Sequence, residues 1–387
     1  MITGAADNDP AGIVTYTQVG AATRYSLIWL ALLCVPMLYA VEEMSSRIAV
    51  VTKHGLNAAI ARRYGLRLAL LVALIVAFAN VATISADIGG MASVMGLLAH
   101  MPYQWFVVPV GSILAYLLYK GNYATVSRFL FILTPFFLVY VAASYLSNPD
   151  FSAVINELYR VSTKPNYLLV AIAMLGTTLS PYLLFWQATE EVEEHRGVKE
   201  LREESRGVLS GMIYTQLIAI ATVIAAGTVL YGSGLVQTAA DAAQALRPAA
   251  GPLAFLLFSF GIIVSGLLAV PILAATTAYV VADAFHWHEG LDRPYKEAKS
   301  FYHVLLLGML IGLVISLLSV NPITMLLYTQ VLNGFLMPFL IWTVLKMADD
   351  PEVVREHKSP PLVRLFAWVS LTIFVIFDSL MIIQWVK

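Results

Sequence analysis

Long apolar runs dominate this sequence of 387 residues. A helix needs about 20 mainly apolar residues to cross a hydrocarbon core about 30 Å thick. Ten runs meet this requirement, at residues 26–50, 68–98, 104–120, 129–147, 167–188, 208–231, 252–284, 302–319, 323–346 and 363–386. An eleventh, weaker apolar element occupies the first 22 residues. The pattern predicts an all-α polytopic membrane protein, a single transmembrane domain over residues 1–387.

The composition excludes several classes of protein. Only 12% of the residues are charged and 59% are hydrophobic, whereas a soluble domain carries about a quarter charged residues. The formal net charge is -1, so no basic face predicts a nucleic-acid partner. The single cysteine, Cys34, rules out an intrachain disulfide framework. The predicted surroundings are a lipid bilayer, and no protein partner is evident.

The basic residues predict an orientation. If successive helices alternate in direction, most of the 23 lysines and arginines fall in connections on one side of the membrane. Cytoplasmic connections carry such an excess. We therefore expect a plasma (inner) membrane protein with a cytoplasmic N-terminus and an external C-terminus.

Two of the predicted helices carry helix-breaking residues. The first contains Asp7, Asp9, Pro10 and Gly12 where a helix should cross the membrane. Only six residues precede Asp7, about 9 Å of helix, whereas half a bilayer needs about 15 Å. We therefore expect the natural chain to start further upstream, and a chain beginning at Met1 to insert or transport poorly.

The second broken helix lies in the run 167–188. Gly176 and Pro181 flank a polar stretch within it. Proline removes a backbone donor and clashes with the preceding turn, so both helices should unwind locally. Unpaired backbone at membrane depth persists only where it lines a cavity or binds something. Two proline kinks without a site are the alternative, but they leave Asp7 and Asp9 unexplained.

The two breaks occupy corresponding positions in two groups of five helices, about residues 1–147 and 167–346, with an extra helix at about 363–386. An odd number of helices per group inverts the second group relative to the first. Interrupted helices at corresponding positions of two such repeats are typical of alternating-access transporters, whose site lies near the membrane midplane.

The side chains near the breaks offer oxygen ligands. Gln330 and Asn333 add amides three residues apart, on one face of a later helix. Oxygen-only sites suit hard divalent cations such as Mg²⁺, Mn²⁺ or Ca²⁺. The predicted metal ligands are Asp9, Thr177, Ser180, Gln330 and Asn333. The metal is then the transported substrate, and no resident cofactor is expected.

Four further residues are candidates for the ion pathway or a gate: Asp7, Thr178, Asp87 and Glu43. Asp87 lies inside an apolar run, where an acid is functional by default, although a structural hydrogen bond to a neighbouring helix is the alternative. Glu43 precedes Arg47 by four residues. Either the two form an ion pair within one helix, or Glu43 makes a gate contact.

Several segments resemble the Nramp metal transporters, the natural-resistance-associated macrophage proteins. Asp9-Pro10-Ala11-Gly12 resembles that family's Asp-Pro-Gly-Asn motif, and residues 43–52 look like the end of its second helix. Gly176 to Pro181 and Thr329-Gln330-Val331 are similar to its sixth-helix and tenth-helix motifs. The resemblance implies a LeuT-type fold and divalent cation transport. It also implies that Asp9, Gln330 and the backbone carbonyl of Thr177 are metal ligands.

Departures from the family pattern concern the metal. Ser180 replaces a methionine and Gly12 replaces an asparagine, which implies a larger site for a harder ion. The predicted substrate is Mg²⁺ and/or Mn²⁺, as in the magnesium transporters related to Nramps.

Other departures concern protons. Tyr182 and Gln187 replace two histidines, and Ile84 leaves Asp87 as the one acid of a former pair. Transport without proton coupling is therefore predicted. The alternatives are a conventional proton-coupled Mn²⁺/Fe²⁺ symporter and a non-transporting metal sensor. An enzyme is not predicted, because no intramembrane-protease or diphosphate-binding motif is present.

Overall fold

The computed structural model describes residues 8–120, 134–158, 160–194, 197, 201–291, 293–318 and 320–386. Every regular element within these ranges is a helix. Eight described stretches are long and apolar enough to cross a membrane, and two shorter apolar helices accompany them. Each of the ten predicted runs overlaps one of these stretches, which confirms the all-α polytopic architecture.

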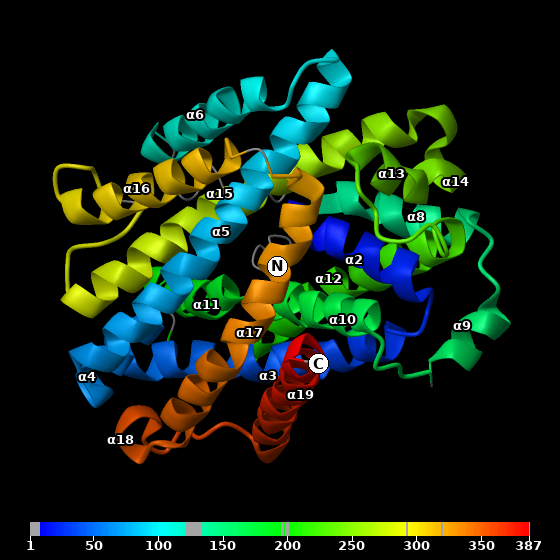
Figure 1. Cartoon of the computed structure of the whole chain (residues 1–387). Helices are drawn as coiled ribbons and strands as arrows, with labels where there is room; N and C mark the ends of the chain where they lie inside the picture. Colours follow the sequence, from blue (N-terminus) through cyan, green and yellow to red (C-terminus); the bar gives the residue numbers. More distant parts are fainter. Residues whose placement is uncertain are drawn as a thin grey trace.

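The helices of the predicted runs, of which α8 is the one short helix in the described residues, lie close to those runs (Figure 1). In chain order they are α3 (Ile28–Thr52), α5 (Leu66–Ala99), α6 (Gln104–Lys120), α8 (Leu138–Leu146), α12 (Leu201–Val229), α15 (Ala254–Phe285), α16 (Lys299–Ser316), α17 (Pro322–Asp349) and α19 (Pro361–Val386).

Short helices in the connections were not predicted, because a search for long apolar runs does not detect helices of four to nine residues. They are α4 (Leu56–Tyr64), α9 (Phe151–Glu157), α13 (Ala239–Ala243), α14 (Arg247–Ala250) and α18 (Pro351–Val354).

The described part of the first helix is α2 (Pro10–Thr23), which begins at the predicted break. Proline suits the first helical position because an N–H there would have no partner within the helix. Nearly every residue of α2 is buried, so the helix is surrounded by protein rather than lipid. The candidate Asp7 lies outside the described residues.

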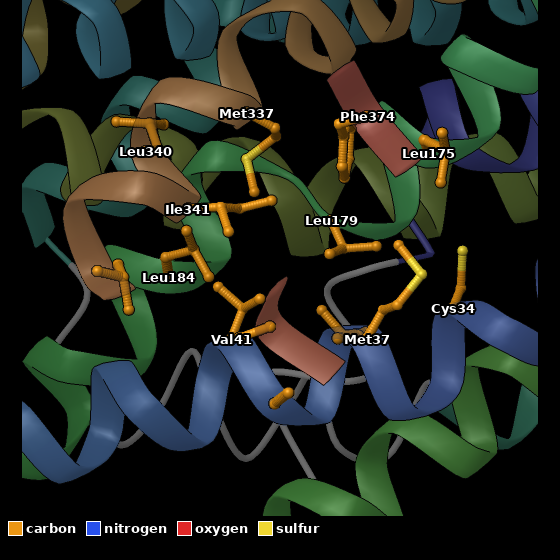
Figure 2. Close-up of a cluster of buried hydrophobic side chains, with 14 of the residues drawn as sticks. Cys34, Met37, Val41, Leu175, Leu179, Leu184, Met337, Leu340, Ile341 and Phe374 are labelled. Atoms are coloured by element: carbon orange, nitrogen blue, oxygen red, sulfur yellow. The ribbon is translucent and has the colours of Figure 1, made fainter. Parts of the chain in front are cut away.

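The sixth helix is broken as predicted. Two residues separate its first half, α10 (Pro165–Thr178), from its second half, α11 (Pro181–Glu193). Leu179 lies between the halves and is fully buried. Figure 2 shows Leu179 among apolar side chains from α3, α17 and α19, which include Met37, Val41, Met337, Ile341 and Phe374. The residue between the two halves is therefore held in an apolar core.

The two glycines assigned to the breaks do not interrupt the helices. Gly12 lies in the first turn of α2, and Gly176 lies inside α10. The prolines start the second halves, whereas Gly176 allows α10 to approach α17. A Cβ on Gly176 would lie 2.0 Å from the carbonyl oxygen of Gln330 and 2.4 Å from the backbone nitrogen of Gly334. Only glycine fits there, so the backbones of α10 and α17 touch close to the break.

We predict that Gly176→Ala destabilises the protein by about 3 kcal/mol or more, because the new methyl group meets backbone that cannot move aside. Thermal unfolding in detergent measures the loss. Gly207→Ala is the matched control, since a Cβ at Gly207 meets nothing within 4 Å. It should be neutral or stabilise by about 0.5–1 kcal/mol, as expected for an alanine in a helix. Equal melting temperatures for the two variants would contradict the close packing.

Candidate metal-binding site

Asp9 lies at the start of α2 and is 1% exposed. It is the N-cap of the helix, and its Oδ1 accepts the backbone N–H of Gly12. A carboxylate is favourable there because the positive end of the helix dipole faces it. The cap orients the carboxylate at the membrane-buried end of a half-helix, where a cation can bind.

The end of α10 presents oxygen atoms toward the break. The Ser180 hydroxyl lies 2.8 Å from the carbonyl oxygen of Thr177 and 2.9 Å from that of Gly176. A hydroxyl has one proton, so Ser180 satisfies one of these carbonyls at a time. The Thr177 hydroxyl is buried and has no partner among the described residues. The break therefore retains free acceptor capacity for a cation.

One hydrogen bond joins the two broken helices directly. Tyr16 on α2 and Thr178 at the end of α10 are fully buried, and their hydroxyl oxygens lie 3.0 Å apart. The bond holds the end of α10 against α2. Thr178, predicted on the ion pathway, is thereby placed at the contact between the half-helices.

Gln330 and Asn333 lie together on α17, as their spacing predicted. Asn333 Nδ2 donates to Gln330 Oε1 at 2.9 Å and lies 3.4 Å from the hydroxyl of Thr83 on α5. Asn333 Oδ1 and Gln330 Nε2 have no partner among the described residues. The free amide oxygen of the pair thus belongs to Asn333.

Asp87 on α5 faces the start of α2. It is fully buried, close enough to Asp9 for their charges to interact, and near the backbone N–H of Ala11. Neither of its carboxylate oxygens has a hydrogen-bond partner within the described part of the chain. Two carboxylates in such proximity repel each other unless a cation or a proton lies nearby. The structure therefore brings Asp87 to the site.

Glu43 belongs to a different cluster. Its carboxylate accepts hydrogen bonds from Arg47, one turn later in α3, and from the Ser359 hydroxyl at 3.3 Å. Ser359 lies in the connection between α18 and α19. The contact with Arg47 is the predicted intrahelical ion pair, and the Ser359 contact joins α3 to the connection that precedes α19.

Three further buried polar side chains were not among the predicted site residues. Asn8, Thr15 and Gln216 are each at most 1% exposed, and their side-chain polar atoms have no partner among the described residues. Gln216 precedes Val223 and Gly227 by seven and eleven residues, so all three share one face of α12. Val223 and Gly227 contact α2 at Gly20. Gln216 therefore faces α2, and this spacing was the signal available in the sequence.

No three histidine, cysteine, aspartate or glutamate side chains gather to hold a metal in the described ranges. The candidate ligands are instead one or two carboxylates together with neutral hydroxyl, amide and carbonyl oxygens. Such a set binds a hard cation more weakly than a cluster of anionic ligands does. Such a weakly binding set of ligands suits an ion that is bound and then released.

Comparison with known proteins identifies the family. The model of the family described as natural resistance-associated macrophage protein-like, Nramp, matches residues 1–384. The chain belongs to the Nramp family. It is 25% identical to the divalent metal cation transporter MntH of Deinococcus radiodurans, over 97% of this chain and 86% of the relative. MntH of Caldanaerobacter subterraneus is 22% identical, over 97% of this chain and 89% of the relative.

Solved structures confirm the LeuT-type fold. The Eremococcus coleocola manganese transporter superposes with a TM-score of 0.81 at 16% identity, covering 97% of this chain and 84% of that one. The transporter Mhp1 gives a TM-score of 0.61 at 11% identity, covering 98% and 91%. The relatives are named as transporters, which confirms that the chain is not an enzyme, and no cofactor is indicated.

We predict that divalent metal raises the melting temperature of the wild-type protein and that Asp9→Asn abolishes this rise. Asparagine keeps the oxygen that caps α2 but removes the negative charge that attracts the ion. At a metal concentration about 100 times the Kd, wild-type stabilisation should be about 2.7 kcal/mol.

Asp150→Asn is the matched control. Asp150 is also an N-cap, accepting the backbone N–H of Ser152 and Ala153, but it lies at an exposed helix in a connection. This variant should keep the full metal response. A normal metal response in Asp9→Asn would show that Asp9 is not a ligand.

Proposed function

We propose that the chain is a secondary transporter that moves divalent metal cations across the membrane by alternating access. The observation that carries the proposal is the buried contact between two broken helices, together with the buried side-chain oxygen atoms of Asp9, Asp87, Thr177 and Asn333 at the start of α2 and on helices that contact it. Aside from the cap bond of Asp9, most of these oxygens lack partners among the described residues. Family membership and the names of the MntH relatives support the same substrate class.

The favoured ion is hard, Mg²⁺ and/or Mn²⁺. Ser180 occupies the position between the half-helices that the resemblance assigns to methionine, and the described residues of both breaks carry no sulfur atom. Sulfur ligands favour softer transition metals, whereas hydroxyl and amide oxygens suit hard ions that keep part of their water shell. The proposed selectivity follows from this replacement.

We propose that transport proceeds without proton coupling. Ile84, at the position of the missing acid, packs against α16: a Cβ on Gly312 would lie 2.7 Å from its side chain. Gln187, at a family histidine position, donates to Glu191 at 2.9 Å. Neither residue can relay a proton. A proton-coupled Mn²⁺/Fe²⁺ symporter remains the second candidate, because Asp87 faces Asp9 and could carry a proton.

The proposed orientation places the N-terminus in the cytoplasm and the C-terminus outside, in the plasma membrane. Arg63 of α4 contacts Asp350 at 2.6 Å and Glu352 at 2.8 Å, next to and within α18. The basic connections that follow the second and tenth helices therefore lie at the same end of the molecule. Their clustering supports a cytoplasmic location for this end.

Uptake into proteoliposomes tests the function. The purified chain should take up Mg²⁺ or Mn²⁺ in preference to Ca²⁺, and a pH dye inside the vesicles should report no acidification linked to uptake. Empty vesicles are the control. Mn²⁺ uptake with acidification and no Mg²⁺ uptake would favour the symporter. Specific metal binding without uptake would favour a sensor.

We predict that Ser180→Met shifts selectivity toward Mn²⁺ over Mg²⁺ by about tenfold, because it adds a soft ligand worth ~1.4 kcal/mol. Competition between the two ions during uptake measures the shift. Ser112→Met, at an exposed position on α6, is the matched control and should not change selectivity. An unchanged ratio in Ser180→Met would place residue 180 outside the ion's coordination shell.

A further inference from the structure

Gln18 of α2 makes paired hydrogen bonds with the loop between α12 and α13. Gln18 is 1% exposed, and its Nε2 donates to the carbonyl oxygen of Val236 at 2.7 Å. Its Oε1 accepts the backbone N–H of the same residue at 2.8 Å. The side-chain amide of Gln18 therefore pairs with both the backbone N–H and the backbone C=O of Val236.

Gln18 lies on the same face of α2 as Ala11 and Thr15, which are closer to the candidate metal site. Ala11, Thr15 and Gln18 are spaced four and three residues apart, so they lie on one side of the helix. The backbone of Ala11 faces Asp87, and Thr15 has a buried, unpartnered hydroxyl. Ala11 and Gln18 are separated by about 10 Å along the helix axis. Gln18 is thus the last polar position on a face that begins beside Asp87.

A cavity adjoins the same loop. Its volume is about 270 Å³, and its lining includes Ser93 on α5, Tyr103, Gln237, Thr238 and Asn321. Gln237 and Thr238 directly follow Val236. The loop therefore contributes Val236 to the contact with α2 and its next two residues to the wall of the cavity.

The rest of the loop has few buried side chains, and Arg24 lies over the Tyr231 ring at 5.8 Å from its centroid. Within residues 231–238, Val236 is the one buried residue, and Gly232 and Gly234 have positive φ angles with nothing near their Cβ positions. Asn321 Nδ2 donates to the carbonyl oxygen of Gln237 at 3.0 Å, a second tether, at the exposed start of α17. A segment with few buried contacts can move when its tethers break.

We propose that Gln18 is a gating residue, whose paired hydrogen bonds with Val236 hold the α12–α13 loop closed between the cavity and the path to Asp87. When α2 and the loop separate, water replaces the two hydrogen bonds and the cavity becomes continuous with the polar face of α2. The inference rests on the proposed transport function, because it assigns the gate of that transport path.

The experiment measures the accessibility of a reporter beneath the gate. Thr15→Cys is introduced into a Cys34→Ala background, which removes the single native cysteine. The rate of labelling by a charged thiol reagent is measured on the purified protein in detergent. Gln18→Glu keeps the acceptor for the N–H of Val236 but loses the donor. We expect labelling about tenfold faster, since one buried hydrogen bond is lost.

A second variant and two controls accompany Gln18→Glu. Asn321→Asp loses the donor to the carbonyl oxygen of Gln237 but keeps the oxygen that caps α17. This variant should therefore also increase the rate of labelling. It tests the gate even if the Gln18→Glu variant does not fold. Gln237→Ala should leave labelling unchanged, because within the described part of the chain that side chain bonds only the carbonyl oxygen of Leu235, a residue of the same loop. Ser93→Cys, in the cavity wall, should label at the same rate with or without Gln18→Glu.

Unchanged labelling of Thr15→Cys in both folded gate variants would overturn the proposal, and so would an equal increase in Gln237→Ala. Metal uptake separates this failure from failure of the proposed function. Wild-type uptake with unchanged labelling refutes the gate alone. Faster labelling in a chain that transports no divalent metal supports the gate and refutes the transport function.

Discussion

Two interrupted helices meeting inside the protein are the constraint on which the rest of the structure depends. A helix end inside a membrane leaves N–H or C=O groups without partners, and lipid cannot satisfy them. Here Asp9 caps the start of α2, and Ser180 satisfies a carbonyl at the end of α10. The Tyr16–Thr178 bond joins the two ends, and Gly176 brings α17 into backbone contact. The candidate site is the place where these requirements are met together.

The same requirements explain the composition of the site. Groups that only satisfied helix ends would leave no polar atoms unpaired. Thr177, Asn333 and Asp87 instead keep buried oxygens without partners in the described ranges. Leaving such groups unsatisfied is costly, and under the proposed function a hydrated cation would satisfy them. The unpaired oxygens therefore favour an ion site over two structural kinks.

Much of the fold was predictable because membrane helices are visible in a sequence as long apolar runs. Pro10 and Pro181 indicate the two breaks directly. The roles of single residues were less predictable. From the sequence, Gly176 is equally consistent with a helix break and with close helix packing. The neighbouring backbone of α17 shows that its role is close packing. Thr15 and Gln216 are isolated polar residues whose importance depends on which helix they face. The Gln18–Val236 contact joins residues 218 apart, and no local pattern encodes it.

α2 connects the candidate site with α10, with the α12–α13 loop and with α9. Asp9 lies at its start, Tyr16 bonds α10 in its second turn, and Gln18 holds the α12–α13 loop. At its end Arg24 forms an ion pair of 2.8 Å with Glu157 of α9. A rigid helix cannot tilt far without straining these contacts together. In the proposed alternating-access mechanism, the Gln18 contact with the loop and the Asp9 carboxylate would therefore move together with α2.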